Sequence, residues 1–265
     1  MQANFNSAKS SLAYARKTKQ DFAGEEDMVM IDSHLHLGGI PSKEKIWGNF
    51  RDYEKLAKKM GISKYCVTPI GLPENFTNQT TPDNNSVLIE ANKNSSVIPI
   101  YWFNVFDLPS KIDKKYKAIK FHPDIGKIEI DDNRVIDFVN KINLPIFVHT
   151  NESKDYSTLG RTSNLARKVH VPVIAVHSGS VTGTFFKLDN YNFPENVYFE
   201  TSGIQYAVIL KKIYERFGAN KIIFGSDYPF GDPRVSLAMI DSLDSKKEEK
   251  EQMISKNLQE ILSLK

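Results

Sequence analysis

Short apolar runs alternate with longer segments of helical period along most of the chain. The apolar runs are rich in Val, Ile, Phe and Tyr, which is typical of buried strands, and the segments between them repeat apolar residues every three or four positions. We expect strands at 28–34, 63–69, 97–105, 117–122, 145–149, 172–177, 196–201 and 221–226. We expect helices at 53–60, 132–142, 158–169, 205–217, 235–243 and 246–264.

This alternation predicts a parallel sheet with helices packed on its outside. Eight strands can close a barrel, and the chain of 265 residues is near the ~250 that such a barrel needs. The predicted fold class is therefore α/β, a (β/α)8 TIM barrel, as one domain over residues 28–265. An open doubly wound sheet is the alternative, but histidines occupy the place of its usual Gly-rich phosphate turn. Residues 1–27 are polar and form an N-terminal extension, either helical or partly disordered.

Composition narrows the range of partners and compartments. Apolar residues make up 40% of the chain, which is enough for a sizeable core, and the net charge is only +3. Because there is no long basic block and no apolar run of the ~18–20 residues that span a membrane, we expect neither nucleic acid nor membrane as a partner. The first 27 residues lack the apolar core of a signal peptide, which favours a cytoplasmic protein. The single cysteine, Cys66, lies in an apolar run and is expected to be packed and inert.

Polar residues of metal-binding type close the predicted strands. They are His34 and His36, His122, His149, His177 and, in place of a histidine, Asp227. The carboxyl ends of barrel strands form one ring, so these side chains would meet in space, and residues two apart on a strand share a face. Nitrogen and carboxylate ligands without thiolates suit zinc, manganese, iron or cobalt. The pattern therefore predicts a metal site, whereas His170 ends a helix and is expected to be a surface or capping residue.

A long polar segment, 71–86, follows the second predicted strand at the end of the barrel where such enzymes keep their active sites. Loops of this length are often substrate lids, and a disordered excursion is the alternative.

In the order of its motifs the chain resembles the amidohydrolase superfamily, in its amidohydrolase-related (type 2) branch. That branch includes aminocarboxymuconate semialdehyde decarboxylase, hydroxybenzoate decarboxylases and several lactone or carboxylate hydrolases. The resemblance extends from residue 28 to the C-terminus, and no single motif is specific without the others. The motifs are His34-x-His36, Lys120-x-His122-Pro123, His149, His177-Ser178-Gly179, Gly225-Ser226-Asp227-Tyr228-Pro229 and Lys256-Asn257-Leu258.

The resemblance implies a role for each matching position. His34, His36, His149 and Asp227 would ligate one divalent ion, with zinc as the first expectation and manganese, iron or cobalt as alternatives. Asp227 and His177 would accept or shuttle the proton of an activated water, or His177 would orient the substrate. Lys120 and His122 would bind a substrate carboxylate or polarise a carbonyl. A second metal bridged by a carboxylated Lys120 is the less favoured arrangement.

Three further residues are candidates for substrate binding. They are Arg161 in the loop after the fifth strand, Glu200 at the end of the seventh, and Tyr228 beside the predicted metal ligand of the eighth. For Glu200 a structural role is an equal alternative.

The leading hypothesis is a mononuclear metal-dependent hydrolase acting on a small polar substrate, a carboxylate, lactone, ester or amide. A non-oxidative decarboxylase, a lyase, is the alternative on the same scaffold, and a non-catalytic metal- or ligand-binding barrel is the second. What disfavours the second is the predicted gathering of Lys120, His122 and His177, because polar groups are costly to bury without a task. The expected partner is a small molecule, and a homo-oligomer is common on this fold in the family.

Overall fold

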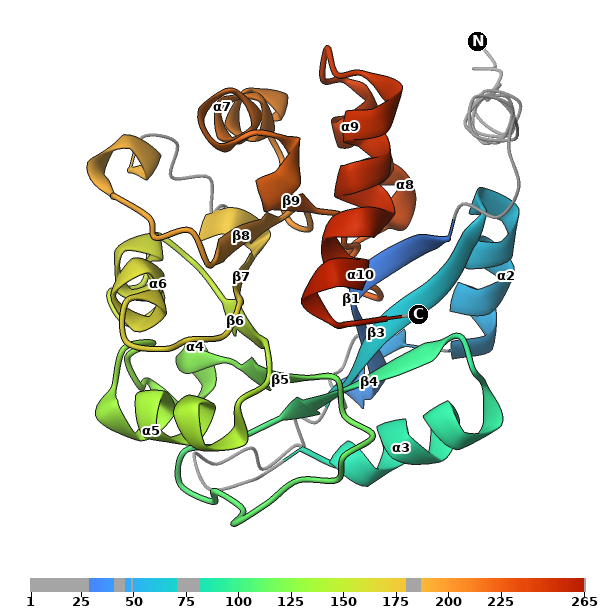
Figure 1. The fold of residues 1–265 in the computed structure, drawn as a ribbon. Helices are drawn as coiled ribbons and strands as arrows, with labels where there is room; N and C mark the ends of the chain where they lie inside the picture. Colours follow the sequence, from blue (N-terminus) through green and yellow to red (C-terminus); the bar gives the residue numbers. More distant parts are fainter. Residues whose placement is uncertain (1–28, 41–45, 49, 71–81, 180–186, 265) are drawn as a thin grey trace, which may run out of the picture.

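The strands form a curved sheet at the centre of the molecule, and the helices surround it (Figure 1). The structure is a computed structural model that describes residues 29–40, 46–48, 50–70, 82–179 and 187–264. Its strands are β1 (Met30–Ile40), β2 (Ile46–Gly48), β3 (Ile62–Ile70), β4 (Val97–Trp102), β5 (Ala118–Phe121), β6 (Ile146–His149), β7 (Val173–Val176), β8 (Val197–Glu200) and β9 (Ile222–Ile223).

The helices on the outside follow the strands in turn. They are α2 (Phe50–Met60), α3 (Asn84–Lys93), α4 (Pro123–Gly126), α5 (Asn133–Ile142), α6 (Leu159–Ala166), α7 (Ala207–Phe217), α8 (Pro233–Asp241), α9 (Lys247–Glu251) and α10 (Asn257–Ile261). Short 3-10 turns lie at η1 (His177–Gly179), η2 (Leu188–Asn190) and η3 (Ala219–Lys221), and a π-helical turn, η4 (Gln252–Lys256), joins α9 to α10.

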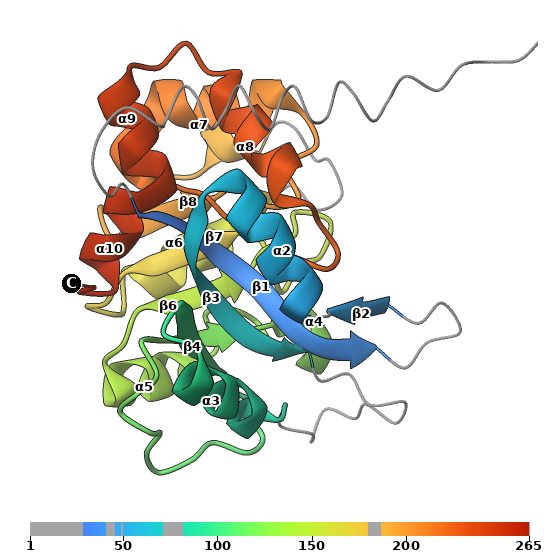
Figure 2. The same ribbon diagram turned by 90° about the vertical axis from the view of Figure 1, so that its right-hand side faces the viewer.

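The parallel strands run in the order β1-β3-β4-β5-β6-β7-β8-β9, and β2 pairs antiparallel with the end of β1 (Figure 2). Backbone hydrogen bonds join the last strand to the first. The N–H of Ser33 donates to the carbonyl of Phe224 at 3.0 Å, and the N–H of His36 donates to the carbonyl of Tyr228 at 2.8 Å. The sheet is thereby closed, which confirms the predicted TIM barrel and excludes the open sheet.

Each predicted strand and helix has a counterpart in the structure, although several bounds differ and β2 and α4 were not expected. Three other differences affect the site or the closure of the barrel. β1 continues to Ile40 instead of ending at residue 34, because its second half pairs with both β2 and β3. Helix α3 was not expected, although Asp83 accepts a hydrogen bond from the N–H of Ser86 as an N-cap does. The predicted loop 71–86 therefore ends at Asp83, while residues 71–81 and the extension 1–27 lie outside the described residues. The closing helix is divided by η4.

Apolar side chains fill the interior of the barrel, and α10 covers its amino end. The interior cluster comprises Ile31, Cys66, Ile98, Ile100, Ala118, Phe147, Ile174, Val176 and Ile223 with Leu258, Ile261 and Leu262 of the C-terminal helix. The hydroxyl of Ser255 donates to the carbonyl of Val29, which fastens this helix region to the start of β1. Burying each large side chain stabilises the fold by about 1.5–3 kcal/mol. With the amino end closed, the carboxyl end is the one that can carry a site.

Two predictions about single residues are confirmed. Cys66 is buried, with a pKa raised well above its usual value by that burial, so its thiol is packed and protonated. His170 is exposed, as a surface residue should be. In the described part of the chain, no helix has both the length and the apolar character needed to cross a membrane.

Candidate active site

The two histidines of β1 converge with Asp227 at the carboxyl end of the barrel. The Nε2 atoms of His34 and His36 lie 3.1 Å apart. Oδ1 of Asp227 lies 3.5 Å from Nε2 of His34 and 3.2 Å from Nε2 of His36. Both imidazoles are buried. Three potential ligand atoms thus face one point.

Hydrogen bonds behind these rings determine which nitrogen carries the lone pair. Nε2 of His34 lies 2.9 Å from Nζ of Lys120, and because an ammonium group only donates, this Nε2 must accept. Nδ1 of His36 lies 3.4 Å from the carbonyl of Pro69, which only accepts, and 2.8 Å from the hydroxyl of Thr68. Nδ1 of His36 is therefore the donor. The Nε2 atoms of both rings thus lie beside the Asp227 carboxylate, and that of His34 also accepts from Lys120.

The described residues contain two groups of donor atoms that all lie within 4.8 Å of one another. One is His34, His36 and Asp227, and the other is His34, His177 and Glu200. His149, a predicted ligand, belongs to neither group. Its ring instead stacks on His122 with centroids 3.8 Å apart and meets His177 edge-on at 4.8 Å.

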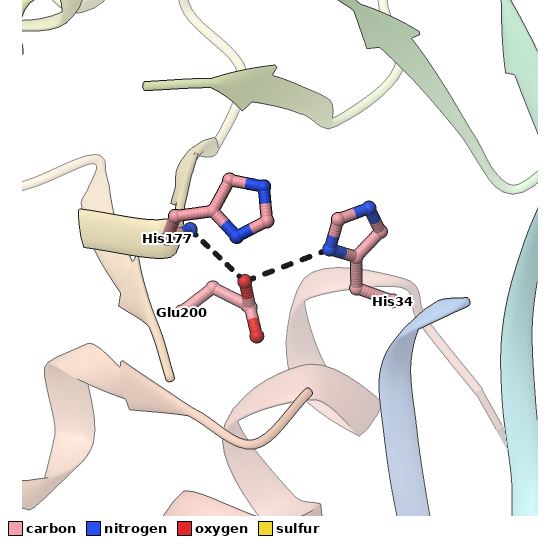
Figure 3. A group of neighbouring side chains, drawn as sticks. All are labelled: His34, His177 and Glu200. Carbon is pink, nitrogen blue, oxygen red and sulfur yellow. Dashed lines mark hydrogen bonds and ion pairs between the residues drawn. The ribbon is translucent and has the colours of Figure 1, made fainter. Parts of the chain in front are cut away.

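Figure 3 shows the Glu200 carboxylate below the rings of His34 and His177. Oε2 of Glu200 accepts from the backbone N–H of His177 at 3.1 Å and lies 3.7 Å from Nδ1 of His34. Glycine at position 225 makes room for this carboxylate, since a Cβ there would lie 2.2 Å from Oε1 of Glu200. Glu200 is fully buried, so it supports the two rings from below and does not line the cavity.

A cavity of about 400 Å³ opens above these residues. Its lining comprises His36, Ile70, Trp102, Lys120, His122, His149, His177, Gly203, Gln205, Asp227 and Phe230. One wall is aromatic, because the indole of Trp102 stacks on His122 with ring planes 8° apart. The volume suits a small molecule with a flat, apolar body and a polar end.

Burial shifts the pKa values of the charged groups in the site. It lowers the pKa of Lys120 to about 8 and of His177 to about 3, and it lowers the pKa of His34 well below its usual value. Burial raises the pKa of Glu200 to about 7. Burial alone would raise the pKa of Asp227, but its neighbours His177, His36 and Lys120 lower it. At pH 7 the site therefore combines a cationic lysine with a neutral His177 and an ionised Asp227.

Two site residues have a backbone conformation that is uncommon for residues with a side chain. His177 has φ 66° and Asp227 has φ 58°, which is the left-handed region that favours glycine. Lys127, Asn143 and Ser263 share this conformation away from the site, so it shapes the turns after β7 and β9 without by itself marking a site.

The structure separates two predicted residues from the cavity. The guanidinium of Arg161 binds Asp131 at 2.7 Å and Glu129 at 2.5 Å, which holds it against the segment between α4 and α5. Tyr228 lines a neighbouring cavity of about 520 Å³.

Among the site residues that the sequence did not predict, four are aromatic or support a histidine. Trp102 and Phe230 line the cavity, Thr68 supports His36, and Ser202 lies beneath His177. Only Ser202 had a sequence signal, since it follows the strand-end pair Glu200-Thr201.

Comparison with known proteins identifies relatives of this fold. The family model described as Amidohydrolase matches residues 110–263. No curated protein matches the sequence.

Three solved structures are similar in fold. The 2,6-dihydroxybenzoate decarboxylase from Rhizobium has a TM-score of 0.64 at 13% identity, covering 89% of this chain and 99% of that one. The 5-carboxyvanillate decarboxylase from Novosphingobium aromaticivorans, complexed with manganese and 4-hydroxy-3-methoxy-5-nitrobenzoic acid, has a TM-score of 0.65 at 12% identity, with 91% and 97% covered. The dihydroxybenzoic acid decarboxylase from Polaromonas, with manganese and 2-nitroresorcinol, has a TM-score of 0.66 at 13% identity, with 89% and 97% covered.

Proposed function

Because the chain belongs to the amidohydrolase family, we propose that it is a divalent-metal-dependent enzyme that removes CO2 from a small, planar carboxylate. The observation that carries the proposal is the meeting of the Nε2 atoms of His34 and His36 and Oδ1 of Asp227 within 3.5 Å. Imidazole nitrogen and carboxylate oxygen are ligand atoms that a divalent ion takes.

The donor atoms fit a metal ion. Two ligands bonded at ~2.1 Å to one ion lie ~3.0 Å apart at a right angle and ~3.4 Å apart at the tetrahedral angle. The spacings among the Nε2 atoms of His34 and His36 and Oδ1 of Asp227 are 3.1, 3.2 and 3.5 Å. We propose these three as ligands, with His149 as the fourth from the facing wall. Nitrogen and oxygen donors suit manganese or zinc, and two of the similar structures contain manganese.

The remaining residues would bind the substrate and move a proton. A bound ion supplies Lewis acidity, which stabilises negative charge on a substrate oxygen. Lys120, cationic at pH 7, attracts the carboxylate, and Trp102 and Phe230 offer aromatic surfaces to a flat ring. Loss of CO2 leaves an electron pair on carbon, which must take up a proton. Lys120, with a pKa of about 8, can supply that proton.

Hydrolysis of a lactone, ester or amide is the second candidate function. The observation that favours it is His177, which lines the cavity and is neutral at pH 7 because burial lowers its pKa to about 3. A neutral imidazole can accept the proton of an attacking water. Decarboxylation is preferred because the cavity has an aromatic wall and three structures of the same fold are decarboxylases.

The test begins with metal content, measured by plasma mass spectrometry on protein purified without chelator or affinity nickel. We expect about one equivalent per chain, lost in His36→Ala and retained in His170→Ala, a matched control because His170 is an exposed histidine. The loaded enzyme is then offered 2,6-dihydroxybenzoate and 5-carboxyvanillate with CO2 release as readout, and a panel of lactones and esters. Release of CO2 supports the proposal, whereas turnover of lactones alone would favour hydrolysis. A chain that binds no metal would refute both.

A further inference from the structure

Ser202 lies beneath two histidines of the site and is fully buried. Its Oγ lies 2.8 Å from Nδ1 of His177 and 3.3 Å from Nδ1 of His34. The same oxygen lies 2.6 Å from Oε2 of Glu200. One hydroxyl thus contacts a carboxylate and two imidazole rings. His177 is the candidate catalytic base, and His34 is a candidate metal ligand.

The hydroxyl of Ser202 can donate one hydrogen bond, and its neighbours determine which of them accepts it. A serine hydroxyl offers one donor and two acceptor lone pairs, and a carboxylate only accepts. When Glu200 is ionised, the hydroxyl of Ser202 therefore donates to it, its shortest contact. The two lone pairs of the hydroxyl are then left for the two Nδ1 atoms, so both rings must carry their proton on Nδ1. The one donor and two acceptor lone pairs of the hydroxyl thus match its three neighbours. The backbone carbonyl of Ser202, 3.3 Å from Nδ1 of His177, only accepts and favours a proton on that nitrogen whichever form Glu200 takes.

Glu200 is held in place for this task by the backbone. The N–H of Ser202 donates to Oε1 at 2.6 Å, and the N–H of His177 donates to Oε2 at 3.1 Å. These bonds leave the carboxylate little freedom to rotate away from the serine. A side chain at position 225 would collide with Oε1, so the glycine there is part of the same arrangement.

An independent contact on the other side of His34 agrees with this assignment. Lys120 donates to Nε2 of His34, which places the proton of that ring on Nδ1, facing Ser202. The tautomer of His34 thus follows from the lysine alone. Ser202 then provides an acceptor on the side where the ring has its proton.

We propose that Ser202, oriented by Glu200, is a positioning residue that fixes the Nδ1–H tautomer of His177 and His34. The lone pair of each ring then lies on Nε2. For His34 this is the nitrogen that faces the proposed metal site, and for His177 it is the nitrogen left to act as a base or to orient the substrate. The catalytic use of His177 rests on the proposed function, but the tautomer does not.

The tautomer can be measured directly by two-bond 1H–15N NMR correlations of the full chain labelled with 15N-histidine and loaded with zinc, which is diamagnetic. The chain has six histidines, and loss of one ring pattern in His177→Gln identifies the resonances of His177. We expect the Nδ1–H pattern for His177 in the wild-type protein. The backbone carbonyl of residue 202, 3.3 Å from Nδ1 of His177, remains as an acceptor in Ser202→Ala. In this variant we therefore expect a mixture of tautomers, with kcat lowered about 10–100-fold and KM changed much less.

Ser178→Ala is the matched control. Ser178 is also buried and also bonds Glu200, but its hydroxyl donates to the backbone carbonyl at 2.8 Å and not to the carboxylate. We expect this variant to keep the wild-type tautomer. Ser202→Thr, which keeps the hydroxyl, should restore the Nδ1–H pattern and most of kcat.

An Nε2–H pattern in the wild-type protein would overturn the proposal, and this result needs no variant that folds. An unchanged tautomer in Ser202→Ala would overturn it as well. If the protein shows the Nδ1–H pattern, becomes a mixture of tautomers in Ser202→Ala and turns over none of the carboxylates or lactones, the positioning role stands and the proposed function fails. The two inferences are thus tested separately.

Discussion

Asp32 joins the first strand of the barrel to the turn after the last strand, and removal of its carboxylate should destabilise the fold. Its carboxylate is fully buried. Oδ1 accepts from the N–H of His34 at 3.1 Å and from the N–H of Ser226 at 2.9 Å, and Oδ2 accepts from the hydroxyl of Tyr53 at 2.6 Å. Asp32 therefore joins the strand that bears the two histidines to the turn that bears Asp227.

The expected change in the free energy of unfolding follows from these three donors. Asp32→Ala leaves three buried donors without this acceptor, at about 1–3 kcal/mol each, or about 6 kcal/mol in total. Against this, the substitution removes a buried charge. Burial raises the pKa of Asp32 from 3.8 to about 6, which corresponds to about 3 kcal/mol at pH 7. We expect a net loss of about 3 kcal/mol in the free energy of unfolding.

Asp32→Asn should behave differently, although it removes the same charge. One oxygen, Oδ1, accepts both backbone N–H groups, so the amide oxygen can replace it, and the amide nitrogen can donate to the hydroxyl of Tyr53. At pH 7 we expect this variant to be as stable as the wild-type protein or more stable.

The pH dependence of the difference gives a second check. A carboxyl whose pKa is raised in the folded state stabilises the fold below its unfolded pKa, and this contribution is lost as the pH rises through the folded value. The stability of Asp32→Asn relative to wild type should therefore increase by about 2 kcal/mol between pH 4 and pH 7.

Urea unfolding followed by both far-UV circular dichroism and tryptophan fluorescence measures these quantities, provided that the two transitions coincide. Tyr53→Phe serves as the partial control, since it removes one of the three donors. Wild-type stability in Asp32→Ala, or an Asp32→Asn protein as unstable as Asp32→Ala, would refute the reasoning.

Three other predictions follow from the contacts of the site. Thr68→Val removes the hydroxyl beside Nδ1 of His36, so metal affinity, measured by competition with a chelator dye, should fall about 10–100-fold; unchanged affinity would contradict the support assigned to it. Lys120→Met should abolish decarboxylation, and wild-type activity should fall as the pH rises above about 8, where the ammonium loses its proton; a flat alkaline limb in a pH–rate profile would count against that role. Arg161→Ala should leave kcat/KM within about twofold of wild type, because its ion pairs lie outside the cavity and such pairs contribute about 0–1 kcal/mol to stability.

The barrel and the general location of its site could be predicted from local sequence patterns. The two-residue period of a strand places His34 and His36 on one face, whatever the rest of the chain does. The predicted residues at the ends of β6 and β7 likewise line the cavity, because parallel strands in a barrel end on the same side. Such inferences need only the period of an element and the direction of its neighbours.

Pairings between distant segments could not be predicted in the same way. Asp32 binds the backbone of Ser226, which is 194 residues away in the chain, and nothing in either segment specifies that register. Arg161 was assigned to the substrate from its loop, but the described structure places it beside two acidic residues of the preceding segment. A charged side chain can reach several partners, and packing of the helices decides which one it meets.

The residues of this chain thus determined by themselves the eight parallel strands of the barrel, the fold class and the polar types at the strand ends, since these depend on hydrophobic period and strand direction. Only the tertiary structure decided that Glu200 lies beneath the rings instead of in the cavity, and that Ser202 links it to two histidines. The physical reason is that a hydrogen bond requires its two atoms to lie within about 3 Å. Barrel closure and the packing of distant segments determine distances on that scale, and the local pattern does not.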